Sequence, residues 1–178
     1  MGRSIWSEQT AAMDAYQAIV TKRDRRRFTS DPVDEADLGR VLQAGRMAGS
    51  AKNSQVARIV VVTDAADRDR LARCGDFAGW LPSAPVVLVL VMPTDGGRLF
   101  DLGRMAQNMM VAANSLGLGS CPVTFHRPGC VGEVLGIPDG YEAPMGVGIG
   151  RPGPPDPGKQ GSPRIPLEEL VHHGGWRQ

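Results

Sequence analysis

Apolar residues recur at helical spacing over residues 101–116 and predict one long helix there. The residues on this face are Leu102, Met105, Ala106, Met109, Ala112, Ala113 and Leu116, and Met110 and Val111 add apolar surface on another side. A helix that is apolar on more than one face needs partners around it, so we expect it at the centre of the fold or at a subunit interface. Gly117 and Gly119 predict its end, and an extended segment is expected at residues 121–125.

The rest of the pattern predicts helices interleaved with short strands. Helical spacing indicates one helix after an N-cap at Ser7, a second from an N-cap at Asp34 to about Gly49, and short helices at residues 65–74, 128–135 and 166–173. Consecutive apolar residues predict strands buried on both faces at 58–63 and 85–92, and a further strand at 143–149. This order is typical of an α+β or α/β layer architecture.

The composition is that of a globular chain with little net charge. The 178 residues suffice for one domain spanning 1–178, and the formal net charge of +1 predicts no general attraction to nucleic acid or membrane. Cys74, Cys121 and Cys130 form no CxxC pair, which argues against a disulfide framework and suits a reducing cytoplasm. The N-terminal residues contain no apolar signal region, and the longest apolar run, residues 84–92, is too short to span a bilayer.

Five cations occur within six residues directly after the first predicted helix. They are Lys22, Arg23, Arg25, Arg26 and Arg27. Three interpretations are open. A nucleic-acid patch would need more cations or aromatic residues on the same surface, and the remaining sequence is charge-balanced. A solvated helix end is a second interpretation, because cations favour a helix C-terminus. An anion clamp is the third, because arginine donors in a fixed fork bind phosphate.

Two other patterns, one of glycines and one of cysteines with a histidine, could indicate a cofactor or metal site. Residues 148–153 match G-x-G-x-x-G, but the prolines at 154, 155 and 157 forbid the helix that a dinucleotide fingerprint must open. Cys121, His126 and Cys130 fit no standard zinc spacing and lack a fourth ligand, so no metal is expected, and a buried thiol with a surface imidazole is favoured. A Cys–His nucleophile pair stays open, although nothing in the sequence orients it.

Three separated segments together resemble the nitroreductase family of FMN-dependent oxidoreductases. Residues 22–28 are similar to its Arg-Arg-Ser-x-Arg-x-Phe segment, and residues 48–55 to its Ala-Pro-Ser-x-x-Asn-x-Gln loop. Residues 101–122 are close to its Asp-x-x-x-Ala-x-Gln-Asn helix followed by Gly-Leu-Gly-Ser-Cys-Pro. Residues 135–138, 148–152 and 164–169 also fit, so the resemblance extends over nearly the whole chain.

The resemblance implies an α+β fold with an antiparallel-dominated sheet flanked by helices. It also implies a homodimer with FMN at the subunit interface, with the Pro/Gly-rich arm at residues 150–178 reaching across the partner. Phosphate contacts would fall to Lys22 or Arg23, to Arg26 and to Arg164, while Asn53 and Gln55 would lie near the flavin ring or ribityl chain. Backbone at Pro122, Val123, Thr124 and Phe125 would line the N5 edge of the ring.

Three departures from the family pattern affect the expected site. Asp24 stands where serine is usual, so we expect only its backbone to contribute to phosphate binding. Val56 and Ala57 replace a Pro-Trp pair, which removes a large ring near the pocket. Only residues 93–100 separate the second buried strand from the long helix, so no lid is expected, and the substrate face would be open or shaped by the arm and Phe125.

The resemblance thus implies a cytoplasmic FMN oxidoreductase with a ping-pong cycle. NADH or NADPH would deliver hydride to the flavin, and a nitroaromatic, quinone or enone would accept it, with no side-chain acid or base required. Alternatives are an oxidase or dehydrogenase of a biosynthetic pathway, an enzyme with a deazaflavin donor, a non-catalytic flavin-binding protein, and a basic nucleic-acid-binding protein. The preferred interpretation involves no nucleic acid and no membrane.

Overall fold

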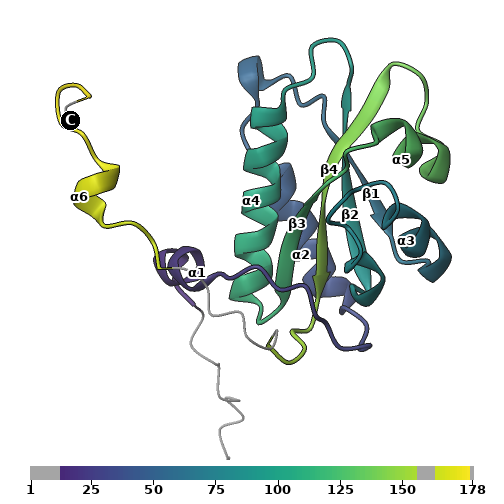
Figure 1. Ribbon diagram of the computed structural model, residues 1–178, viewed down its shortest axis with the longest axis horizontal. Coiled ribbons are helices and arrows are strands. Elements are labelled where there is room, and N and C mark those ends of the chain that lie inside the picture. Colours follow the sequence, from purple (N-terminus) through teal and green to yellow (C-terminus); the bar gives the residue numbers. More distant parts are fainter. Residues whose placement is uncertain (1–12, 156–162, 177–178) are drawn as a thin grey trace, which may run out of the picture.

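The computed structural model describes residues 13–155 and 163–176, which are built around a four-stranded antiparallel sheet (Figure 1). The strands are β1 (Arg58–Val62), β2 (Val86–Pro93), β3 (Gly119–Thr124) and β4 (Tyr141–Gly150), in the spatial order β1-β2-β4-β3. In the register of the sheet, Val89 of β2 lies between Val60 of β1 and Gly146 of β4. The predicted alternation of helices and strands is confirmed.

Helices cover both faces of this sheet, and β2 supplies side chains to both layers. Leu88 and Leu90 point into a core shared with α2 (Glu35–Arg46) and α4 (Leu99–Ser115). Val87, Val89 and Val91 point the other way, into a core shared with α3 (Ala65–Leu71) and α5 (Pro128–Leu135). Successive residues of a strand face opposite sides of the sheet, so a strand that lies between two cores, as β2 does, requires an uninterrupted apolar run. The prediction for residues 85–92 is confirmed.

The long helix expected at residues 101–116 is α4, and it packs between the sheet and α2 (Figure 1). Its buried residues are Leu102, Ala106, Met109, Met110 and Ala113. Asn108 links α4 to α2, because its side-chain amide donates to the carbonyl oxygen of Ala44 at 3.2 Å. One stripe of α4 stays exposed, and it includes Phe100, Arg104 and Gln107.

The two ends of the described chain lie on the same side of the sheet as α4 (Figure 1). Helix α1 (Ala15–Thr21) begins at Asp14, whose carboxylate accepts from the amide of Gln17 at 2.8 Å. The predicted N-cap Ser7 lies outside the described residues, as does the part of the arm at 156–162. Helix α6 (Leu167–Leu170) is shorter than the predicted 166–173, because Val171 already adopts an extended conformation.

The sequence prediction for β1 is wrong in one respect. Residues 58–63 were expected to be buried on both faces, but β1 is an edge strand and only Val62 is buried. Val61 is 41% exposed. A run of β-branched residues therefore occurs here without burial on both sides, and the run alone does not distinguish an edge strand from a central one.

The expectation of no disulfide is also wrong. Cys74, in the turn after α3, is bonded to Cys130 in α5, with 5.5 Å between the Cα atoms. Cys121 is the remaining cysteine, and it is free and buried. Within the described residues, no helix is long and apolar enough to cross a membrane.

Candidate functional site

The basic segment at residues 22–28 continues the sheet beyond β3. It leaves α1 in an extended conformation, and the amide of Arg25 donates to the carbonyl oxygen of Ser120 at 2.9 Å. Asp24 pairs with Ser120 in a parallel bridge, and Phe28 pairs with Pro152 in an antiparallel one. The sequence therefore places its densest run of cations along the edge of the sheet, next to the start of β3.

A hollow of about 1190 Å³ lies over this segment, and we call it the basic hollow. It is lined by Ile19, Val20, Lys22, Arg23, Asp24, Arg25, Arg26, Arg27, Gln107, Pro154, Pro155, Pro163 and Arg164. All the residues expected to meet a phosphate are in this lining. The structure thus brings the segment after α1 and Arg164, which follows the arm, to one place.

The partners of these side chains indicate which donors are available. The ammonium of Lys22 contacts the carboxylate of Asp24 at 2.6 Å. The charge of the one acidic side chain that lines the hollow is therefore neutralised by a lysine of the same lining. The guanidinium of Arg23 donates to the carbonyl oxygens of Val20 and Lys22, each at 2.8 Å. Among the described residues, Arg25, Arg26 and Arg164 have no side-chain hydrogen bond or ion pair, so these three guanidinium groups are available to an anion. Arg26 and Arg164 are the two of them that were expected at a phosphate.

Strand β3 leaves part of its outer edge open beyond the basic segment. The carbonyl of Ser120 points to this edge, since it accepts from Arg25 there, and the alternation of an antiparallel ladder aims the backbone of Pro122 and Thr124 the same way. Both residues are exposed. The open edge therefore offers the amide of Thr124 as a donor, because Pro122 has none.

The other two residues expected at this edge have buried side chains. Val123 and Phe125 belong to the core between the sheet and α5, and Phe125 is only 3% exposed. The expectation that the Phe125 side chain shapes a substrate face is therefore wrong. Its ring fills the space left by Gly146, where an added Cβ would lie 3.3 Å from it.

Cys121 lies beside the basic segment but is not poised to react. Its side chain is fully buried, and burial raises the pKa of its thiol to about 11, against the opposing influence of Arg26. The thiol is therefore protonated at neutral pH, and a thiol rather than a thiolate is a poor nucleophile. His126 does not complete a Cys–His pair, because its Nδ1 accepts from the amide of Asp76 at 3.1 Å.

The second predicted segment, residues 50–55, forms a loop with unusual backbone angles. Lys52, Asn53 and Gln55 have φ values of 54°, 52° and 49°, in the left-handed region that non-glycine residues seldom adopt. The side chain of Ser50 accepts from the amide of Gln55 at 3.0 Å, and Asp101 of α4 accepts from the amide of Ala51 at 3.1 Å. Strained backbone held by specific bonds is common at functional sites.

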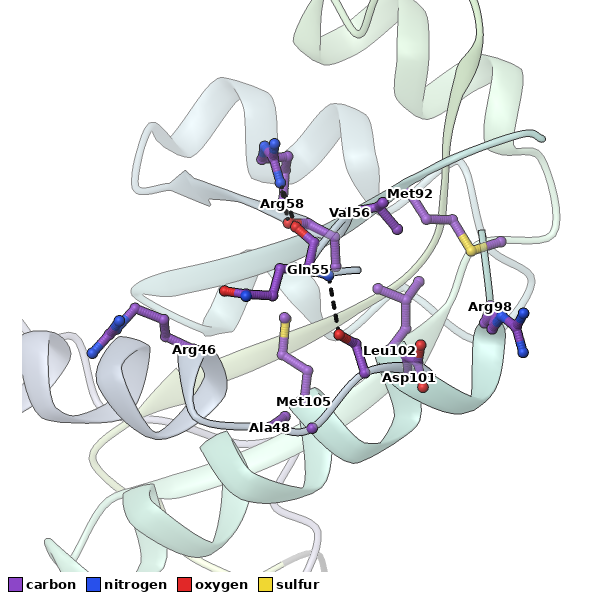
Figure 2. A pocket seen from close by; sticks show the side chains of 13 residues that line it. Arg46, Ala48, Gln55, Val56, Arg58, Met92, Arg98, Asp101, Leu102 and Met105 are labelled. Carbon is purple, nitrogen blue, oxygen red and sulfur yellow. Dashed lines mark hydrogen bonds between the residues drawn. The ribbon is translucent and has the colours of Figure 1, made fainter. Parts of the chain in front are cut away.

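Beneath this loop lies a pocket of about 230 Å³, which we call the loop pocket. Figure 2 shows Met92, Leu102 and Met105 around it, and a dashed line marks the hydrogen bond from the Gln55 amide. Gln55 lines this pocket, whereas Asn53 lines none of the hollows described here. The loop thus presents its polar groups to a pocket that Met92, Leu102 and Met105 line together with the charged residues Arg46, Arg58, Arg98 and Asp101.

The two halves of the expected site are not brought together in one chain. Residues 50–55 contact Asp101 at the start of α4. The residues before the basic segment contact the other end of α4, where the side chain of Asn114 donates to Thr21 at 3.0 Å. Asn114 lies thirteen positions after Asp101 in the helix, which corresponds to roughly 20 Å. In Figure 1 the two segments accordingly lie toward opposite ends of α4.

The connection from β3 to α5 is braced by residues 73–76, just behind the open edge. The carbonyl oxygen of Cys74 accepts from the amide of Arg127 at 3.0 Å. The guanidinium of Arg127 contacts the carboxylate of Asp76 at 2.6 Å and the carbonyl oxygen of Arg73 at 2.7 Å. The hydrogen bond from Arg127 lowers the pKa of Asp76, so this carboxylate stays ionised and bound to Arg127 at a lower pH than an ordinary carboxyl would.

Gly75 makes the brace fit against Thr124. A Cβ at this position would lie 2.6 Å from the carbonyl oxygen of Thr124. We therefore expect Gly75→Ala to push β3 and the brace apart and to cost about 1–3 kcal/mol of unfolding free energy, measured by urea titration. Gly79→Ala is the matched control, because a Cβ there meets nothing within 4 Å. Equal stability of the two variants would contradict the tight contact.

Comparison with known proteins identifies the family. The family model described as "Nitroreductase family" matches residues 19–91 and 77–151. The chain belongs to the nitroreductase family. It is 30% identical over 184 residues to an NADPH-flavin oxidoreductase from Vibrio harveyi, a match that covers 93% of this chain and 75% of the relative. The predicted nitroreductase-like fold is confirmed as well.

Two solved structures show how closely the nitroreductase fold is shared. Nitroreductase A from Vibrio parahaemolyticus has a TM-score of 0.81 and 31% identity, covering 93% of this chain and 78% of that one. An NADPH:FMN oxidoreductase from Vibrio harveyi, solved in complex with NAD⁺, has a TM-score of 0.77 and 28% identity, covering 92% and 78%.

One residue of the nitroreductase helix motif was not singled out from the sequence. Gln107 is exposed on α4 and lines the basic hollow, whereas its neighbour Asn108 is engaged with α2. The Gln-Asn pair of the motif was visible, but only the packing of α4 shows which of its two amides faces the hollow. Val56 and Ala57, in place of Pro-Trp, line the loop pocket, where two small side chains leave space.

Proposed function

We propose that this single-domain protein is a cytoplasmic FMN-dependent oxidoreductase that uses NADH or NADPH to reduce a small acceptor. The observation that carries the proposal is the basic hollow, which both Arg26 and Arg164 line without partners among the described residues. The names of the Vibrio harveyi relative and structure, an NADPH-flavin oxidoreductase and an NADPH:FMN oxidoreductase complexed with NAD⁺, support the choice of cofactor and donor.

The donor set of the basic hollow fits a phosphate monoester. Guanidinium groups form charge-assisted hydrogen bonds to phosphate, and Arg26 and Arg164 would supply them. Asp24 does not oppose this, because Lys22 neutralises its carboxylate at 2.6 Å, and its backbone is the part that would contribute. Gln107 offers an amide to the hydroxyls that adjoin the phosphate in FMN.

The open edge of β3 would hold the flavin ring. When bound, FMN supplies the hydride and electron transfer between NAD(P)H and the acceptor. The amide of Thr124 would donate to the N5 edge and stabilise negative charge that develops on the ring, while Pro122 offers only a carbonyl there. Asn53 and Gln55 would supply polar contacts to the ring or the ribityl chain. No acid or base from a side chain is needed in this proposal.

The separation of the two half-sites along α4 favours a homodimer with FMN at its interface. One copy would contribute the basic hollow and the other copy residues 50–55, because in one chain residues 50–55 and the residues before the basic segment contact α4 at Asp101 and Asn114, which are roughly 20 Å apart along the helix. Exposed apolar side chains support this assembly. They include Tyr16 and Ile19 on α1, Phe100 on α4, and Leu167, Leu170 and Trp176 in the C-terminal segment, which would extend over the partner.

The short connection between β2 and α4 bears on the acceptor. Only residues 94–98 join the two elements, and no helix lies between them. Such a connection would leave the outer face of the flavin uncovered from this side. Flat acceptors of varied outline, such as nitroaromatics, quinones and enones, fit an open site of this kind.

The visible spectrum of the purified protein tests the proposal directly. We expect a bound flavin of FMN mass whose absorption is lost on addition of NADH or NADPH without oxygen, and recovered on addition of menadione. A flavin that stays oxidised after addition of NADH and of NADPH would contradict the proposal that a nicotinamide is the hydride donor. Absence of flavin even after incubation with FMN would contradict the proposal as a whole and leave only the fold in common.

A further inference from the structure

We propose that the Cys74–Cys130 disulfide is a redox-responsive cross-link that controls the flavin edge of the site. The proposal rests on the proposed function, because that edge is assigned to FMN. Cys74 is fully buried after α3, whereas Cys130, in the first turn of α5, is half-buried. The bond therefore joins two segments that are 56 residues apart in sequence, and the residue at one end of it is more exposed than the residue at the other.

The cross-link closes a small ring around the β3–α5 connection. The carbonyl oxygen of Cys74 accepts from the amide of Arg127 at 3.0 Å, and three residues later Cys130 is bonded to the same Cys74. His126 is held as well, because its ring accepts from the amide of Asp76 at 3.1 Å. The two segments thus have a covalent link and several hydrogen bonds within a few residues.

The ring transmits its position to Thr124. Gly75, next to Cys74, packs so closely that an added Cβ would lie 2.6 Å from the carbonyl oxygen of Thr124 and 3.7 Å from the Cα of Phe125. A shift of residues 74–75 must therefore be accompanied by a shift at the end of β3. The open edge offered to the flavin is thus rigid when the cross-link is present and freer when it is absent.

The cytoplasm, to which the proposed function assigns the protein, favours reversible chemistry over a permanent cross-link. In a reducing cytoplasm, persistent structural disulfides are rare, and those that form are usually catalytic or redox-sensing. A dithiol reductant would attack the half-buried Cys130 sulfur, and the Cys74 sulfur would leave and take up a proton. A second thiolate of the reductant then releases Cys130, so two electrons and two protons pass to the protein and the reductant becomes a disulfide.

The reduced form keeps the hydrogen bonds of the brace but loses its covalent link. We expect FMN to bind at least about fivefold more weakly to the reduced protein, the lower end of typical coupling between two sites. Amide protection of Asp76 and Arg127 against hydrogen exchange should fall at the same time. The effect on exchange does not depend on FMN, so it tests the cross-link even if the protein binds no flavin.

The experiment titrates wild-type protein in dithiothreitol buffers of graded potential. Native aliquots are quenched with N-ethylmaleimide under denaturing conditions and weighed by mass spectrometry, while FMN affinity and hydrogen exchange are measured in parallel. We expect one alkylated cysteine in the oxidised protein and three in the reduced protein, with affinity and exchange changing at the same potential. Cys130→Ala should match the reduced wild type and show no response to dithiothreitol.

Each alternative result has a defined meaning. Three alkylated cysteines in protein purified under air would show that no disulfide forms and overturn the proposal. A bond that resists dithiothreitol in the native protein would make it a permanent staple, which also overturns it. Reduction without any change in FMN affinity or in exchange at Asp76 and Arg127 would show that the bond does not control the flavin edge, which overturns the proposal. Absence of FMN binding in both states, with exchange responding, would overturn the proposed function and the assignment of this edge to FMN.

Discussion

Replacing Arg26 and Arg164 together by alanine is expected to weaken FMN binding about a hundredfold or more. Both guanidinium groups line the basic hollow, and within the described chain neither has a partner that would retain it elsewhere. A hydrogen bond to a charged group contributes about 1.5–3 kcal/mol, so losing two costs at least about 3 kcal/mol. Binding is measured by quenching of FMN fluorescence at several salt concentrations, and the wild type should show the steeper salt dependence.

Arg40→Ala is the matched control for this pair. Arg40 is an exposed arginine of α2 whose nearest carboxylate, Asp37, lies 3.9 Å away, and it does not line the basic hollow. Its removal lowers the net charge by one without touching the proposed clamp, so FMN affinity should stay within experimental error. Unchanged flavin occupancy in the Arg26/Arg164 double variant would remove the phosphate assignment.

The same double variant can report whether the site spans two copies. We expect Asn53→Asp to weaken FMN binding from the other half-site, because it replaces an amide donor by a carboxylate while tolerating the left-handed backbone. If the halves come from different copies, mixing the two inactive proteins creates dimers with one intact site, and flavin binding returns in part. If both halves came from one copy, every site in the mixture would carry a lesion and no binding would return.

Removing the disulfide is expected to lower the free energy of unfolding by about 4 kcal/mol. Cys74 and Cys130 are 56 residues apart, and closing a loop of that length restricts the unfolded chain by this amount in the chain-entropy description. The change is measured by urea titration of Cys74→Ala/Cys130→Ala against the wild type. Protein concentration must be fixed, because the stability of a dimer depends on it.

Reductant provides the internal control for this prediction. Dithiothreitol should lower the stability of the wild type toward that of the double variant and leave the double variant unchanged. The double variant also removes two sulfur atoms from a core that contains Leu71 and Val131, so a small loss should persist under reducing conditions. Equal stability of oxidised and reduced wild type would contradict a cross-link that restrains the unfolded chain.

Local pattern predicted the elements well because it reports burial on each face. The apolar run at residues 85–92 corresponds to β2, whose side chains enter the cores on both faces of the sheet. The helical spacing at 101–116 corresponds to α4, which packs in the core shared with α2. Asp34 was read correctly as an N-cap, since its carboxylate accepts from the amide of Ala36 at 2.8 Å. The exposure of Val61 was missed, because the position of a strand within a sheet depends on long-range pairing.

The composition of the site was more predictable than its assembly. Lys22, Arg26 and Arg164 were named together from motifs, and they line one hollow. The distance between this hollow and Asn53 depends on the length of α4, and no local signal carries it. The bond between Cys74 and Cys130 was missed for the same reason, because two cysteines 56 residues apart give no indication that the turn after α3 lies beside α5.

The residues that line the basic hollow come from distant parts of the sequence, and this has a consequence for biosynthesis. Its first residues, Lys22 to Arg26, leave the ribosome early, whereas Arg164 follows only after the whole sheet has been made. A nascent chain can therefore fold its core and still lack part of the clamp. Under the proposed function, tight capture of the cofactor is deferred until the chain has been made and extruded beyond Arg164, and shorter nascent chains would not compete for FMN.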